Sequence, residues 1–150
     1  AVRNGPRHAR HGPPAGGRRQ VTYSYTSSTD RGFDETVARV KESLKDQGFG
    51  VLTEIDIQAT LREKLGVEME PFLIIGACNP GFASRALAAE PGVGVFLPCN
   101  VVVRRSGGST VVEAMDPSVM GQFFDSPEMT DLVGQVAPLV DAALSEAAGR

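Results

Sequence analysis

Two Cys-Asn pairs are the residues of this chain best suited to chemistry: Cys78-Asn79 and Cys99-Asn100. Each pair joins a thiol, which can act as a nucleophile or bind a soft metal ion, to an amide that can hydrogen-bond a ligand. Cys78 also lies just before Asn79-Pro80, a favourable helix start, and the positive end of a helix dipole favours a thiolate. We therefore predict a pocket at the two pairs that binds a small anion, a soft metal ion or a redox partner.

A packing role explains the same residues without any ligand. Free Cys is among the most buried residue types and packs as a small hydrophobic side chain. Asn79 is explained as a helix N-cap, and Asn100 as a partner for the bend that follows Pro98. At the level of sequence both interpretations stay open, and packing is the commoner explanation for Cys.

Arg104 is a further candidate, because an arginine can hold a carboxylate or a phosphate with two hydrogen bonds. Successive strand residues face opposite sides, so only one of Arg104 and Arg105 can point at a given site. The alternative is a surface ion pair with Glu113 or Asp116, worth under ~1 kcal/mol. We add Arg104 to the two Cys-Asn pairs as a predicted ligand-binding residue.

The distribution of histidine excludes several kinds of site. Both histidines, His8 and His11, lie near the start of the chain, and residues 21–150 contain none. This composition removes a Ser-His-Asp or Cys-His arrangement from that segment, and imidazole metal ligands as well. We assign no catalytic residue, no metal ligand and no cofactor. The four Met look like core filler, and two Cys are too few for the disulfide framework of a small secreted domain.

Charge divides the chain into two parts. Residues 1–20 hold five Arg and no acidic residue, and they are rich in Gly and Pro, so we expect a disordered basic tail. The remaining residues, 21–150, hold ten basic and all 18 acidic residues, a net charge of −8. An acidic body argues against nucleic-acid binding, which needs a clustered basic face. We see neither an apolar run long enough for a membrane span nor a signal peptide, and we expect a cytoplasmic protein.

Hydrophobic periodicity and turn residues predict one α+β domain over residues 21–150. We expect a two-layer sandwich of β-α-β-α-β-α-β-β-α order, with a mixed sheet and helices on one side. The predicted elements are strand 21–27, helix 34–47 capped by Asp34, strand 51–57, helix 59–65, strand 72–78, helix 80–89, strand 93–105 bent at Pro98, a hairpin turn at 106–109 with strand 110–114, a helical turn from Pro117, and a last helix from Ser126-Pro127 that Pro138 should kink or split.

The number of residues between the two Cys-Asn pairs suggests how the fold brings the pairs together. The segment 80–92 is long enough for a right-handed crossover between parallel neighbouring strands. In that arrangement Cys78 and Cys99 lie near the same end of the sheet, where ligands often bind. We expect Cys78 to be the more reactive thiol, because only Cys78 precedes a helix.

Several stretches together resemble a known family. They are FLIIGACNP (72–80), GVFLPCNVVVRR (94–105), EAMDPSVM (113–120) and the opening KESLKDQGFGVLTEIDIQATLREKLG (41–66). They are similar to the bacterial and archaeal family called domain of unknown function 302, over about residues 21–148. The resemblance implies an α+β fold and a homodimer, and it implies no activity, because none is assigned to the family. The strand 101–103, apolar on both faces, agrees with a dimer.

Three functions stay open. The first is a small-molecule or ion-binding domain, dimeric, with its pocket at the two Cys-Asn pairs. The second is a thiol-dependent redox or sulfur-handling enzyme with Cys78 as nucleophile and Cys99 as resolving thiol, disfavoured by the lack of a general base. The third is a structural dimerisation module. The expected partners are a second copy of the chain and a small molecule or anion, with no nucleic acid and no membrane.

Overall fold

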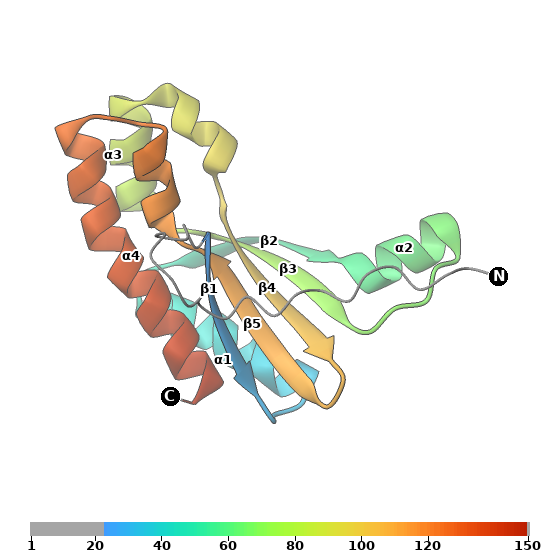
Figure 1. Ribbon diagram of the computed structural model, residues 1–150. Coiled ribbons are helices and arrows are strands. Elements are labelled where there is room, and N and C mark those ends of the chain that lie inside the picture. Colours follow the sequence, from blue (N-terminus) through green and yellow to red (C-terminus); the bar gives the residue numbers. More distant parts are fainter. Residues whose placement is uncertain (1–22, 150) are drawn as a thin grey trace, which may run out of the picture.

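A computed structural model describes residues 23–149, which form an α+β domain (Figure 1). The predicted tail at 1–20 and the first predicted strand residues, 21 and 22, lie outside this range. The strands are β1 (Ser24–Thr29), β2 (Gly50–Asp56), β3 (Phe72–Cys78), β4 (Cys99–Ser106) and β5 (Ser109–Met115). The helices are α1 (Phe33–Asp46), α2 (Ile57–Leu65), α3 (Pro80–Ala89) and α4 (Pro127–Ala148), with 3₁₀ segments η1 (Pro91–Phe96) and η2 (Pro117–Gln122). The predicted order of helices and strands is confirmed.

The five strands form one sheet in the order β1-β5-β4-β3-β2, and every neighbouring pair is antiparallel. The prediction of a mixed sheet with β3 and β4 parallel is therefore wrong. A parallel connection must cross the length of the sheet, about 23 Å for a seven-residue strand. The segment between the two strands does not cross back along the sheet: α3 packs on α4 and η1, and the chain re-enters beside the end of β3.

The two faces of the sheet differ sharply. One face packs against α1 and α4, which also pack against each other (Figure 1). A row across this face runs through neighbouring strands and is buried: Ile75, Val101 and Ala114 are 0 %, 1 % and 3 % exposed. The opposite face carries the alternate residues of each strand and is covered by neither α1 nor α4. The two longest helices, α1 and α4, thus lie on one side, as predicted, whereas α2 continues from the end of β2 and contacts β3 (Figure 1).

The last helix, α4, supplies much of this core. An apolar stripe along α4 is buried except for the half-buried Val133; its members are Met129, Leu132, Val133, Val136, Val140, Ala143 and Leu144. Pro138 was expected to kink or split the helix, yet α4 runs unbroken from Pro127 to Ala148. Pro138 and Gly134 are both exposed, so the Gly134 carbonyl that loses its amide partner faces water, which limits the disruption.

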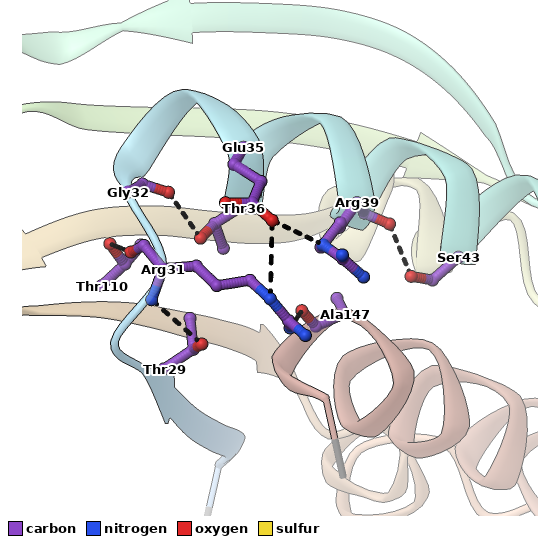
Figure 2. Close-up of polar contacts among 9 residues, drawn as sticks. All are labelled: Thr29, Arg31, Gly32, Glu35, Thr36, Arg39, Ser43, Thr110 and Ala147. Carbon is purple, nitrogen blue, oxygen red and sulfur yellow. Dashed lines mark hydrogen bonds and ion pairs between the residues drawn. The ribbon is translucent and has the colours of Figure 1, made fainter.

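The junction between β1 and α1 shows how the first helix is fixed (Figure 2). Asp34 was expected to cap α1, but the N-cap is Gly32, which makes no side-chain capping bond. Thr36 instead donates its hydroxyl hydrogen to the Gly32 carbonyl at 2.8 Å. Thr110 of β5 donates to the Arg31 carbonyl at 2.7 Å, and this bond ties the start of α1 to the sheet.

The segment before β4 also differs from expectation. A strand was predicted from Val93, but Pro91–Phe96 forms η1 and the strand starts only at Cys99. Pro98, where a bend was predicted, follows a cis peptide bond and lies immediately before the strand. In the range that the structure describes, no helix is both long and apolar enough to cross a membrane.

Candidate functional site

A cleft lies at the end of the sheet where β3 ends and β4 begins, and we call it the thiol cleft. The space between its walls is about 490 Å³ when the open solvent at its mouth is included. The sheet and its flanks form one side, α3 and η1 a second, and α4 with η2 a third. The lining residues are Phe49, Ala77, Cys78, Asn79, Phe82, Ala83, Ala86, Val93, Leu97, Cys99, Met120, Met129, Leu132, Val133 and Val136.

Both cysteines line the thiol cleft, and both are half-buried free thiols. The register of β3 on β4 pairs Ala77 with Cys99, so Cys78 is the next residue along the neighbouring strand. The two cysteines therefore meet as predicted, although by an antiparallel arrangement. In this geometry the end of one strand and the start of the next are adjacent without any crossover.

Asn79 holds the start of α3. Its side-chain oxygen accepts a hydrogen bond from the amide of Phe82 at 3.3 Å, and Pro80 occupies the first helical position. The predicted cap is confirmed. The amide nitrogen of Asn79 packs over Gly48, since a Cβ added there would lie 3.1 Å from it. Asn79 thus joins α3 to the turn after α1, where Gly48 adopts a φ of +85° that only glycine adopts at little cost.

Gly76 and Pro98 set the spacing between the two strands at the cleft. A Cβ on Gly76 would lie 2.9 Å from Cγ of Pro98 and would overlap Oγ1 of Thr53 in β2. Glycine therefore lets a proline ring and a neighbouring strand close over β3 at the same point. Pro98 is directly followed by Cys99, so this close approach helps to fix the position of the Cys99 thiol.

The thiol cleft is lined mainly by apolar side chains and by no charged one. Burial, reinforced by the neighbouring Cys78, raises the pKa of Cys99. At neutral pH Cys99 is therefore a protonated thiol and a weak nucleophile. Apart from the two thiols, Asn79 is the one polar side chain among the lining residues, and its oxygen is engaged in the cap. No carboxylate, lysine or arginine belongs to the lining.

Two of the predicted ligand-binding residues do not line the thiol cleft. Asn100 is exposed on the other face of the sheet, paired with Gly76. Arg104 lies on that same face, where its Nε donates to the carboxylate of Glu113 at 2.9 Å. This contact is the cross-strand ion pair considered as the alternative. Alternation along β4 explains both results, since Cys99 faces the helices and the even-numbered residues face away.

The sequence reading missed the helix side of the cleft. Met120 and Met129 were interpreted as core filler, and η1 was read as a strand, so Val93 and Leu97 were not associated with the cysteines. Phe96 of η1 packs on Phe123 and Phe124 with ring centroids 5.4 and 5.9 Å apart, and these contacts hold η1 against η2. The available signal was the apolar stripe of α4, since Met129, Leu132, Val133 and Val136 of that stripe line the cleft.

The fold and the cleft together define a small α+β domain with an antiparallel sheet, helices on one face and an apolar cavity at one sheet end. The family model described as domain of unknown function DUF302 matches residues 23–147, and the chain belongs to this family. A solved structure titled as an uncharacterized conserved DUF302 protein from Bacillus stearothermophilus is similar, with a TM-score of 0.78 and 32 % sequence identity. The alignment covers 85 % of this chain and 99 % of that one. None of the curated proteins matches the chain.

Proposed function

We propose that this domain binds a small, mainly apolar molecule in the thiol cleft. The observation that carries the proposal is the lining: fifteen residues, of which Asn79 and the two thiols alone bear polar side-chain atoms. Ligand sites are mostly concave and apolar with a few placed polar groups, and the thiol cleft has the same character.

Binding is favoured over catalysis by what surrounds the thiols. A nucleophilic cysteine needs a neighbouring base or a lowered pKa, and no carboxylate, histidine or lysine lines the cleft. The raised pKa of Cys99 works against a role in thiol exchange. The thiol-dependent redox enzyme therefore ranks behind a binding domain, and it rests on Cys78 alone as the attacking group.

Filling the cleft tests the proposal. Ala83 lines the cleft from α3, and Ala88 is exposed on the same helix outside it. We expect the full chain to bind a fluorescent anilinonaphthalene dye and Ala83→Phe to bind it much more weakly, with Ala88→Phe as the matched control. Circular dichroism should show both variants folded. Equal dye binding by the wild type and both variants, or no binding by the wild type, would contradict the proposal.

A second proposal is that two copies of the chain associate through the open face of the sheet. The observation favouring it is a row of apolar residues on that face: Ile55, Ile74 and Val102 pair across β2, β3 and β4. Ile55 is 47 % exposed, and α1 and α4 cover only the other face. Burying such a row against a second copy removes apolar surface from water.

Light scattering tests association. At micromolar concentration we expect about twice the 15.9 kDa mass of one chain. Val102→Lys should give the mass of one chain, and Val95→Lys in η1 is the control, because Val95 is 86 % exposed and lies away from the sheet. A single-chain mass for the wild type at high concentration would rule the dimer out and leave the binding proposal untouched.

A further inference from the structure

The thiol cleft contains an unusual set of metal-binding atoms. Two thiols come from the sheet side, Cys78 at the end of β3 and Cys99 at the start of β4. Two thioethers come from the helix side, Met120 in η2 and Met129 in the first turn of α4. The two methionines belong to one buried cluster, together with Val93 and Leu132. Met69 and Met115 do not line the cleft, so half of the methionines gather at the two cysteines.

The chemistry of this donor set is selective. Thiolate and thioether sulfurs are soft ligands that favour Cu(I), whereas Mg²⁺, Ca²⁺ and Mn²⁺ favour carboxylate and carbonyl oxygens. A structural zinc site needs four Cys or His ligands, and the lining offers two. Among residues 23–149, no group of three or more His, Cys, Asp or Glu residues is placed to hold a metal ion. These four sulfur atoms are therefore poor ligands for hard divalent ions.

We propose that the thiol cleft binds one monovalent soft metal ion, Cu(I), through Cys78 and Cys99, with the thioether of Met120 or Met129 completing the coordination. The inference rests on the proposed binding function of the same cleft and names an ionic ligand for it. Each thiol that coordinates as a thiolate releases its proton to solvent, and neither the ion nor the protein changes oxidation state. The apolar walls formed by Phe82, Val93 and Leu132 would keep water from the ion.

The test is an anaerobic competition experiment on the reduced full chain. Cu(I) is titrated into a mixture of the protein and bicinchoninate, and native mass spectrometry reports the number of ions bound. We expect one Cu(I) per chain, and loss of retention in both Cys78→Ser and Cys99→Ser. The double variant Met120→Leu/Met129→Leu should bind at least about tenfold more weakly. Met69→Leu is the matched control and should bind as the wild type does. Ag(I) should give the same pattern.

Several outcomes overturn the proposal. No retention of Cu(I) by the wild type overturns it, and so does retention by either serine variant equal to that of the wild type. An unchanged affinity in the double methionine variant refutes the site as assigned. The dye experiment separates this failure from that of the binding function. A protein that binds the dye but not Cu(I) has a ligand cleft and no metal site, whereas one that binds neither lacks both.

Discussion

Replacing Gly76 by alanine should destabilise the domain and disturb the cleft at once. The backbone of Gly76 does not require a positive φ, so alanine is conformationally allowed. Restricting the unfolded chain would by itself stabilise the variant by about 0.4–1 kcal/mol. Against this gain stands the clash of the new methyl group with Thr53 and Pro98, and overpacking of this kind costs about 1–3 kcal/mol.

The two contacts differ in how easily they yield. Thr53 is exposed and its hydroxyl can rotate away, whereas the ring of Pro98 is fixed by the backbone. We therefore expect the clash to exceed the entropic gain, with a net loss of about 1–2 kcal/mol. The residual shift should fall on Pro98 and hence on Cys99, which follows it.

Urea denaturation measures the loss, and a double-mutant cycle with Thr53→Ala locates it. In the Thr53→Ala background the cost of Gly76→Ala should fall without disappearing, because the Pro98 contact remains. The rate of Cys99 alkylation should change in Gly76→Ala and not in Thr53→Ala alone. A Gly76→Ala variant as stable as the wild type, with the same alkylation rate, would refute the idea that Gly76 and Pro98 fix this end of the sheet.

Three further predictions concern single residues. Asn79→Ala should cost about 0.5–2 kcal/mol in urea denaturation while Asn79→Asp keeps the cap, and equal stability of the two variants would contradict the capping role. In single-cysteine variants Cys99 should alkylate more slowly than Cys78, and its rate should rise at higher pH than that of a free thiol, because burial raises the pKa of Cys99. Burial, with the charges of Asp116 and Asp141, raises the pKa of Tyr25 to about 12. The folded state therefore favours the neutral phenol, and this contribution is complete below pH 10 and lost as the pH rises toward 12. Phenolate absorbance in Tyr23→Phe checks it, and titration of Tyr25 near 10 would be the contrary result.

Local signals predicted the elements nearest the cleft well. The continuous apolar run at 72–78 became β3 with the expected bounds, and Asn79-Pro80 started a helix that ends at Ala89. In both cases the signal lies within the segment itself: a buried strand needs apolar residues throughout, and a helix start needs a cap and tolerates proline. The meeting of Cys78 and Cys99 was predicted for the wrong reason, since the strands are antiparallel.

The helix side of the cleft could not be predicted in the same way. The residues at 91–98 are short, apolar and rich in Gly and Pro, so periodicity alone does not distinguish a strand from a 3₁₀ turn. What decides the outcome is long-range packing, because Phe96 contacts aromatic rings of residues 123 and 124. Arg104 and Asn100 were assigned to the pocket without a strand register. Once the register is known, alternation places them on the other face.

The arrangement of the two buried clusters explains how one small domain can hold both a stable sheet and an apolar cavity. The larger cluster joins the sheet to α1 and α4, and the smaller one comprises Val93, Met120, Met129 and Leu132. Phe82 packs against both. Between β3 and β4 the chain forms α3 and η1, which pack against the second cluster and cover the space beside the thiols. Because the sheet row at Ile75 and Val101 lies in the first cluster, the strands that position Cys78 and Cys99 are packed by side chains other than the four of the second cluster.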